Sequence, residues 1–540
     1  MASSSSSSLL KFFLILSSIF ISSTFAAHNK SSTTPLDLLH ITSFCKTTPY
    51  PESCLESLKL SININISPNI LNLLLQTLQT AISEAGKLTH LFSNAGNSNN
   101  IVEEQRGTIQ DCQELHQITL SSLRKSESKI KAGGSKSLAD ARTYLSAALT
   151  NKNTCWEGLD SASGPMKPVL LNSMTNTYKH VSNSLSMLPE SGTKKGHNNR
   201  RRLLGFPSWV SRKDRRSLQT SADEYDPSEV ITVAADGTGN FTTISDAINF
   251  APNNSEGRVI IYVSQGVYEE NVVIPSNKLN IVLLGDGSDV TSITGNRSVG
   301  DGWTTFRSAT LAVSGEGFLA RDVAIENSAG PEKHQAVALR INADLAALYW
   351  CTINGYQDTL YTHSFRQFYR ECDIYGTIDY IFGNAAVVFQ ACNIVSRMPM
   401  PGQFTVITAQ SRETPDEDTG FSIQNCSILA TDELYNNSNS VKSYLGRPWR
   451  VYSTTVYLES YIDDFIDPTG WTKWDGEKGL DTLYYGEYEN YGPGSGTENR
   501  VTWPGYHVME YADAYNFTVS EFIAGDAWLD STSFPYDEGI

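Results

Sequence analysis

A short hydrophobic theme recurs five times in the second half of the chain and restricts the fold more than any other feature. In each copy a Val or Cys occupies the same place, and this row consists of Val323, Cys351, Cys372, Cys392 and Cys426. Periods of roughly 20 to 35 residues around one strand theme are typical of a solenoid, and short turns between parallel strands favour a parallel β-helix. A sandwich of antiparallel strands remains an alternative, because it can produce the same spacing.

The β-rich runs that carry this theme are separated by Gly, Asn, Asp and Ser. Equivalent positions on neighbouring coils of a β-helix lie about 4.8 Å apart, within the Cα range of a disulfide. Cys351 with Cys372, and Cys392 with Cys426, are therefore candidate bridges. We expect strands at residues 259–263, 280–284, 309–313, 346–353, 368–374, 387–394 and 421–428.

The first half of the chain shows helical periodicity instead. Apolar residues recur at spacings of three and four, as in Leu71, Leu74, Leu75, Leu78 and Ile82. Similar stripes, joined by short polar connections, predict an all-α four-helix bundle over residues 36–188. The predicted helices span residues 68–95, 103–131, 135–151 and 165–188.

The first 27 residues have the pattern of a secretory signal peptide. The apolar run 12–21 is short for a membrane span, and small residues at 24–27 offer a cleavage site. An uncleaved signal anchor is the alternative. Export agrees with the even count of eight cysteines and with glycosylation sequons at Asn240, Asn296 and Asn516. No C-x-x-C pair occurs, so we expect disulfides and no metal site.

Charge divides the chain into two unlike parts. The net charge of -17 combines +7 over residues 1–226 with -24 over residues 227–540. A domain of -24 is expected to avoid nucleic acid and anionic lipid, because both are polyanions that bind Lys and Arg.

Clustered basic residues fill a Gly-, Asn- and Ser-rich segment, 189–226, between the two parts. The segment reads as a linker, and a solvated charge run or a nucleic-acid tail is the alternative interpretation. In an exported chain, dibasic sites in such a linker are candidate sites for a processing protease. The candidate processing residues are Arg201, Arg202, Arg215 and Arg216.

Three clusters combine Gly, aromatic residues and carboxylates where a plain turn needs only Gly or Asn. They lie at residues 266–270, 355–361 and 379–384. Together with residues 335–339 and 445–449, they occur in the order of the signature segments of the pectin methylesterase family. Residues 227–540 therefore resemble this family, although each motif alone is a weak signal.

Asp358 and Asp379 lie 21 residues apart, about one coil of a β-helix. Two neighbouring carboxylates resist double ionisation, so one stays protonated while the other is an anion. The family resemblance implies that Asp379 is the nucleophile and Asp358 the proton donor and base. It also implies that Gln335 and Gln357 stabilise the oxyanion and that Arg447 orients Asp379.

The same resemblance gives a set of sugar-binding positions: Thr305, Gln335, Tyr361, Phe382, Arg447 and Trp449. Each candidate also has a purely structural alternative, such as turn capping for Asp358 and Asp379 or core closure for Trp449. The cluster at 266–270 is expected to support folding. Where the family commonly has Phe, this chain has Tyr380, whose hydroxyl needs a partner if it is buried.

Four cysteines precede or lie within the predicted helices, as a close pair, Cys45 and Cys54, and a distant pair, Cys112 and Cys155. Spacing alone allows three connectivities. The pattern resembles the invertase and pectin methylesterase inhibitor family, which implies that the first cysteine pairs with the second and the third with the fourth.

The sequence thus predicts a secreted, glycosylated, monomeric precursor for the cell wall: signal peptide 1–27, inhibitor-like domain 36–188, linker 189–226, and a right-handed parallel β-helix over 227–540. The resemblance implies hydrolysis of the C6 methyl esters of homogalacturonan without a cofactor. The helical domain is expected to cover the cleft or assist folding until processed, with separate inhibitor proteins as further partners. A pectate lyase, a polygalacturonase and a non-catalytic pectin-binding protein are the alternatives.

Overall fold

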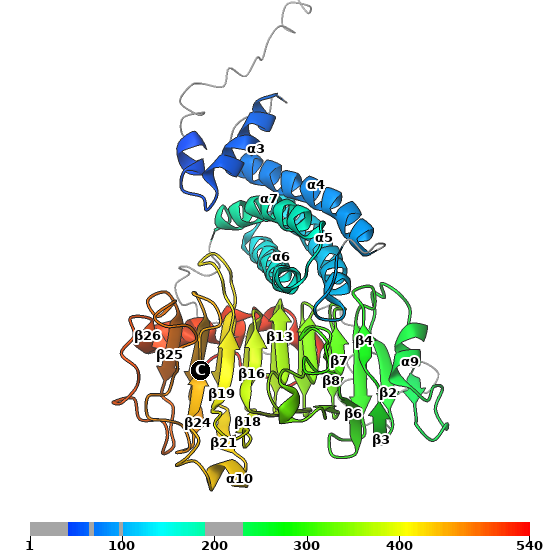
Figure 1. Ribbon diagram of the computed structural model, residues 1–540, viewed down its shortest axis with the longest axis vertical. Coiled ribbons are helices and arrows are strands. Elements are labelled where there is room, and N and C mark those ends of the chain that lie inside the picture. Colours follow the sequence, from blue (N-terminus) through cyan, green and yellow to red (C-terminus); the bar gives the residue numbers. More distant parts are fainter. Residues whose placement is uncertain (1–40, 64–69, 97–100, 190–229) are drawn as a thin grey trace, which may run out of the picture.

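The computed structural model describes residues 41–63, 70–96, 101–189 and 230–540. A helical body, drawn in blue and cyan, lies against one side of a long stack of strands (Figure 1). The predicted signal peptide, and the predicted linker beyond Pro189 with its four candidate processing arginines, lie outside the described residues. None of the helices in the described ranges is both long enough and apolar enough to cross a membrane.

The helical body contains four long helices, as the apolar stripes predict. Leu74, Leu78 and Leu88 of the first long helix are buried, and so are Leu145 and Leu185 of later ones. The shorter α3 precedes them. The bounds are α3 Pro51–Asn63, α4 Ile70–Gly96, α5 Thr108–Ala132, α6 Ser135–Ser161 and α7 Lys167–Ser186. The third long helix, α6, extends well past residue 151, where the prediction ends it.

Two disulfides hold this body together. Cys45–Cys54 joins the short helical turn at residues 41–45 to α3, and Cys112–Cys155 joins α5 to α6. This is the connectivity that the resemblance implies.

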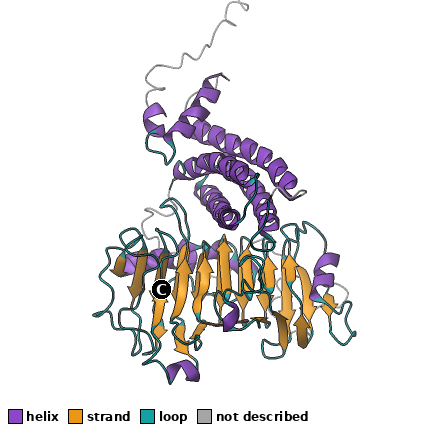
Figure 2. Ribbon diagram, viewed as in Figure 1, coloured by secondary structure: helices purple, strands orange, loops and turns teal. Residues whose placement is uncertain are grey.

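Residues 231–508 form a parallel β-helix of three sheets (Figure 2). The eleven-stranded sheet contains β1 Ile231–Val233, β2 Val259–Val263, β5 Ile281–Gly285, β8 Leu319–Arg321, β11 Ala346–Tyr349, β14 Arg366–Arg370, β17 Ala386–Gln390, β20 Gly420–Gln424, β23 Thr454–Leu458, β25 Tyr484–Tyr488 and β26 Tyr506–Val508. The seven-stranded sheet contains β4 Val272–Ile274, β7 Leu311–Val313, β10 Leu339–Asn342, β13 Leu360–Ser364, β16 Ile378–Gly383, β19 Thr405–Gln410 and β22 Ser443–Gly446. The eight-stranded sheet contains β3 Gly266–Glu269, β6 Thr291–Gly295, β9 Ala324–Asn327, β12 Thr352–Asn354, β15 Asp373–Gly376, β18 Asn393–Ser396, β21 Ser427–Ala430 and β24 Tyr461–Ile462.

Short helices pack against the first strands of the β-helix and cover part of the eleven-stranded sheet. Val519, Trp528 and Leu529 from the carboxyl-terminal segment pack on the outer face of this sheet, against Leu319 and Phe368. The short helices are α9 Ile244–Phe250, α10 Asp432–Tyr435, α11 Tyr511–Ala514 and α12 Val519–Phe522, with 3₁₀ turns at Pro331–Lys333, Tyr515–Phe517, Gly525–Ala527 and Leu529–Ser531.

Neighbouring strands in all three sheets pair in parallel, which rules out the antiparallel sandwich. Inward residues of successive coils stack into one core, as in the row Leu311, Leu339, Leu360 and Ile381. The repeat therefore corresponds to coils of a β-helix, as the sequence predicts.

Four of the predicted strands are each split in two by a corner. Trp350, Glu371, Ala391 and Asn425 have φ between 50° and 55° and interrupt the predicted strands 346–353, 368–374, 387–394 and 421–428. A left-handed residue of this kind turns the chain from the eleven-stranded sheet into the eight-stranded one. The recurring theme is thus a strand, a corner and the start of a second strand.

The expected bridges between coils are wrong. Cys351, Cys372, Cys392 and Cys426 stack on consecutive coils, yet all four are free, buried thiols. In a parallel, in-register stack the Cα–Cβ bonds point the same way, so Cβ atoms stay about 4.8 Å apart, whereas a disulfide prefers about 3.8 Å. The cysteines serve as core residues.

Two further sequence features have structural partners. Glu270, in the cluster at 266–270, accepts hydrogen bonds from the amides of Ile244 and Ser245 at 2.7 and 3.0 Å, and so caps the first turn of α9. The buried hydroxyl of Tyr380 lies 3.0 Å from Ser396 Oγ. The departure from the family's Phe is therefore accommodated by one added hydrogen bond.

The helical body covers the outer face of the seven-stranded sheet. Outward residues of this sheet, including Ala312, Tyr361, Phe382 and Ala409, belong to the same apolar cluster as the core of the helices. The helices α5 and α6 lie closest to the strands (Figure 1).

Candidate active site

Asp358 and Asp379 lie on neighbouring coils, as their spacing predicts. Leu360 pairs with Ile381, which brings the two aspartates level, and the Asp358 amide donates to the Ile378 carbonyl at 3.0 Å. Both aspartates have positive φ, 61° and 52°. A register shift between Ile378 and Ile381 also interrupts the pairing of β16 with β19 at Asp379. Such local strain and irregular pairing are common where a sheet aims a side chain into a site.

Arg447 binds only one of the two carboxylates. It follows β22, and its Nε and Nη2 donate to Asp379 Oδ1 and Oδ2 at 2.8 and 2.6 Å. Trp474 lies 4.2 Å from the guanidinium carbon and Phe404 lies 5.5 Å from it, measured to the ring centroids. The planar fork fixes the orientation of the Asp379 carboxylate.

The two aspartates differ in how their proton equilibria are perturbed. Burial raises the pKa of Asp358 well above its ordinary value, and the neighbouring charge of Asp379 raises it further. Burial also raises the pKa of Asp379, but the hydrogen bonds and charge of Arg447 oppose this shift. Under the helical body, Arg447 therefore limits the rise without lowering the pKa of Asp379 below its usual range. Asp358 is the better candidate for the protonated partner.

A cavity of about 440 Å³ lies over these two aspartates. All of the predicted catalytic and sugar-binding residues line it: Thr305, Gln335, Gln357, Asp358, Tyr361, Asp379, Phe382, Arg447 and Trp449. The structure therefore brings together the residues that the sequence analysis selects.

Aromatic rings form one wall of the cavity. Tyr361 and Phe382 stack with centroids 4.2 Å apart, and Trp449 follows at 6.0 Å from Phe382. Trp474, which the sequence analysis does not select, stacks on Trp449 at 6.3 Å. Flat apolar faces in a row suit the faces of sugar rings. The pair of Trp residues at 471 and 474, shortly after the 445–449 motif, is the only sequence signal for Trp474.

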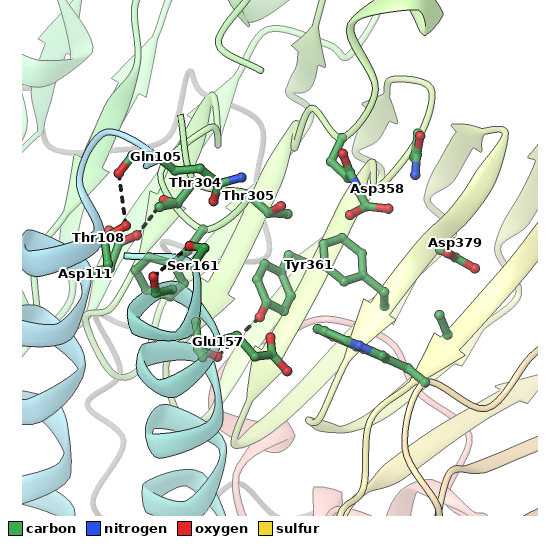
Figure 3. Close-up of a pocket in the computed structure, with 18 of the residues that line it drawn as sticks. Gln105, Thr108, Asp111, Glu157, Ser161, Thr304, Thr305, Asp358, Tyr361 and Asp379 are labelled. Carbon is green, nitrogen blue, oxygen red and sulfur yellow. Dashed lines mark hydrogen bonds between the residues drawn. The ribbon is translucent and has the colours of Figure 1, made fainter. Parts of the chain in front are cut away.

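None of the predicted site residues belongs to the helical domain, yet its helices form the other wall of the cavity (Figure 3). The lining residues from this domain are Gln105, Thr108, Asp111, Thr154, Glu157, Gly158 and Ser161. Thr154 Oγ1 lies 2.9 Å from His363 Nε2 and 3.4 Å from the Tyr361 hydroxyl. Asp358 and Asp379 thus face a cavity that residues of both domains line.

Polar contacts continue along α6 on the neighbouring coils. Asn384 Nδ2 donates to Thr150 Oγ1 at 2.8 Å, and Asn342 Nδ2 donates to Asn151 Oδ1 at 3.2 Å. The helix therefore crosses several coils of the seven-stranded sheet next to the aromatic row.

Arg142 connects the helical domain to a loop of the β-helix. Its Nε and Nη2 donate to the Asp418 carboxylate at 2.7 and 2.9 Å. Its guanidinium also donates to the carbonyls of Asp416 and Leu188. Because the side chain is buried, these contacts make Arg142 a principal anchor between the domains.

Two family descriptions match the chain, one over each body. Residues 230–526 match the family described as Pectinesterase, and residues 40–187 match the family described as Plant invertase/pectin methylesterase inhibitor.

Individual relatives agree with both matches. A protein of Arabidopsis thaliana named "Probable pectinesterase/pectinesterase inhibitor 12" is 70% identical over 532 residues, which cover 96% of this chain and 97% of its own. A solved pectin methylesterase from carrot is 51% identical and covers 57% of this chain and 98% of its own, with a TM-score of 0.57. A pectin methylesterase from Aspergillus niger is 35% identical over 57% of this chain and 97% of its own, with a TM-score of 0.50.

Proposed function

The chain belongs to the pectinesterase family and carries an inhibitor-like domain on the same polypeptide, and from this premise we propose that its β-helix hydrolyses the methyl esters of pectin. The products are methanol and pectate. The proposed setting is the cell wall, after secretion.

In the first half of the proposed reaction, a carboxylate oxygen of Asp379 attacks the C6 ester carbon of a methylated galacturonate. The C6–methoxy bond breaks, and the departing oxygen takes the proton of Asp358, so that methanol leaves. Asp379 is then joined to C6 as an acyl-enzyme.

In the second half, the Asp358 carboxylate takes a proton from water, whose oxygen attacks C6. The bond between C6 and Asp379 breaks, which releases C6 as a carboxylic acid and restores the ionised Asp379 and the protonated Asp358; the released acid then loses its proton to solvent and becomes the galacturonate carboxylate. Each attack places negative charge on the C6 carbonyl oxygen. Gln335 and Gln357 are assigned to this oxyanion because a neutral amide donates a hydrogen bond without neutralising Asp379.

One observation carries this assignment: two buried carboxylates lie one coil apart, and an arginine fork binds only Asp379. The fork favours an ionised, oriented Asp379, and burial favours a protonated Asp358. A nucleophile and an acid are thereby distinguished by their surroundings.

Methanol release without chain shortening tests the reaction class. We expect the β-helix to release methanol from methylated pectin while the number of reducing ends stays constant. New reducing ends would indicate a galacturonase, and calcium-dependent formation of unsaturated ends would indicate a lyase. Pectin binding without any product would indicate a non-catalytic protein.

The helical domain is proposed to keep the precursor inactive. Thr154 and Glu157 of α6 line the cavity opposite the aromatic row, so the helix occupies space that a polymer on this row would need. Cleavage at Arg201–Arg202 or Arg215–Arg216 by a processing protease would separate the domains.

Comparison of the intact chain with a chain cut after folding tests this proposal. A site for a specific protease, introduced within 190–229, allows the two parts to be cut and separated. Methanol release is expected to rise by about 100-fold or more, since a stable interface must be removed first. Equal activity of the intact and separated forms would sink the autoinhibition proposal.

A further inference from the structure

Arginines gather beneath the helical domain on the otherwise acidic β-helix. Arg307, Arg340, Arg366 and Arg450 each form an ion pair with a carboxylate of α5 or α6. The domain that carries them has a net charge of -24 over residues 227–540. This local positive surface therefore opposes the overall charge of its own domain.

Two of the four arginines have partners within the β-helix itself. Arg366 pairs with Asp344 at 2.7 Å, and Arg450 pairs with Glu413 at 3.4 Å. Over residues 230–540, Arg307 and Arg340 form no ion pair with a carboxylate of the β-helix. Their partners are Asp111 and Glu114 of α5, at distances of 2.7 to 3.2 Å.

Arg340 is unusual for a buried cation. Its side chain is 1% exposed, and its Nε and Nη1 have no hydrogen-bond partner. The guanidinium stacks on Phe306, 3.4 Å from the ring centroid, and its Nη2 donates to Glu114 at 3.2 Å. A buried arginine with so few partners is costly, so stability of the precursor does not explain it. With the helices removed, Arg340 loses its ion pair with Glu114 and keeps two unused donors.

Strand register defines the position of Arg340 relative to Asp358 and Asp379. Arg340 pairs with Tyr361, and Tyr361 pairs with Phe382, on successive coils. Arg340 thus lies in the aromatic row, two coils or about 10 Å from the coil of Asp379. A sugar chain can lie on these rings along the axis of the β-helix with its reacting unit at Asp379. The carboxyl group of a nearby unit would then lie at Arg340.

We propose that Arg307 and Arg340 form a carboxylate-binding subsite for a demethylated galacturonate unit beside the reacting one. An arginine fork binds a carboxylate with two charge-assisted hydrogen bonds, whereas a methyl ester offers no charge. In the precursor, Asp111 and Glu114 occupy this subsite as carboxylate mimics. The proposal rests on the proposed function only for the identity of the sugar.

It follows that pectate and the helical domain compete for the same two arginines. Once the linker is cut, a demethylated product favours dissociation of the helical domain, because either the carboxylates of α5 or those of the product can neutralise the arginine pair, but not both at once. Hydrolysis would then promote its own release from inhibition.

The β-helix folds without the helices, which allows a direct binding test. Its main core contains only residues after 230, and the carrot structure is nearly fully covered by 57% of this chain. Binding of a fully demethylated oligogalacturonate to the separated β-helix is measured by calorimetry. This readout does not depend on esterase activity, so it distinguishes failure of the subsite from failure of the proposed function.

Arg307→Gln and Arg340→Gln are each expected to weaken binding by about 10-fold, the effect of one lost charge-assisted contact. Arg321→Gln, on the opposite sheet, makes the same charge change and is expected to leave affinity unaltered. The oligogalacturonate should also displace the helical domain from the wild-type β-helix after cleavage, and less effectively from the two variants.

Several results would overturn the subsite. One is an unchanged affinity of Arg307→Gln and Arg340→Gln for the oligogalacturonate, and another is an equal loss of affinity in Arg321→Gln. A third is equally tight binding of a poly-glutamate of similar length, which would show unspecific attraction of polyanions. Retained displacement by the double variant would overturn the competition.

Discussion

Replacement of Arg447 tests the part of the site that distinguishes the two aspartates. Its side chain donates two hydrogen bonds to a carboxylate that is only 6% exposed. Loss of both in Arg447→Ala removes about 3 kcal/mol of preference for the charged form of Asp379. This corresponds to a rise of about 2 units in the pKa of Asp379, because one unit is about 1.4 kcal/mol.

The pH profile of kcat/KM for methanol release by the separated β-helix reports this pKa. Since a nucleophilic Asp379 must be ionised, the acid limb of the Arg447→Ala profile should move about 2 pH units upward. At a pH on the acid side of both limbs, kcat/KM should be about 100-fold lower than in the wild type. Arg447→Lys keeps the charge but not the fork, so about half of that shift is expected. Arg321→Ala serves as the control. An acid limb that stays in place in Arg447→Ala would refute the role given to this arginine.

Three further perturbations test the acid, the interface charge and the anchor. Asp358→Asn should lower methanol release by roughly 10²- to 10⁴-fold. It should also abolish the alkaline limb of the pH profile, because this limb reports loss of the proton from the Asp358 carboxyl group, whose pKa is raised. An alkaline limb like that of the wild type would contradict the role of Asp358 as proton donor. Burial at the interface raises the pKa of Asp111 to about 6. Assembled domains therefore bind more protons than separated ones, and the cut domains should associate more tightly as pH falls from about 6 to about 4. The lowered pKa of Glu114 opposes this trend at the acid end of the range. Calorimetric titration should find this slope flattened in Asp111→Asn, and an unchanged slope would argue against it. In the same assay, Arg142→Ala loses the two hydrogen bonds to the Asp418 carboxylate. Association of the two domains should therefore weaken about 100-fold, or by about 3 kcal/mol. An unaltered dissociation constant would show that Arg142 does not anchor the domains.

Much of the β-helix is predictable from the sequence because its coils repeat. The separations in the row from Val323 to Cys426 give the coil length, and the 21 residues between Asp358 and Asp379 place both on one face. These relations depend only on the number of residues per coil, so they can be predicted without knowledge of side-chain contacts.

The corners and the thiol ladder are not predictable in the same way. Trp350, Glu371 and Ala391 adopt left-handed conformations that these residue types rarely favour, because stacking of neighbouring coils overrides local preference. The candidate cysteine bridges depend on the direction of Cα–Cβ bonds, which sequence spacing does not contain.

The second wall of the cavity is the least predictable part of the site. Helical periodicity identifies the core face of α5 and α6, but it cannot say which polar side chains meet another domain. Asp111, Thr150 and Thr154 each have a partner in the β-helix that the helical pattern does not reveal. Their role emerges from contacts between segments about 200 residues apart in sequence.

The proposed mechanism depends above all on Asp379 as the nucleophile, and replacement of this residue in the separated β-helix is the most direct test. Asp379→Asn keeps the size of the side chain but removes the carboxylate that is proposed to attack C6. Methanol release should fall by about 10⁴-fold or more, while the fold and the binding of oligogalacturonate persist. Methanol release within about 10-fold of wild type, in a correctly folded variant, would contradict the central claim.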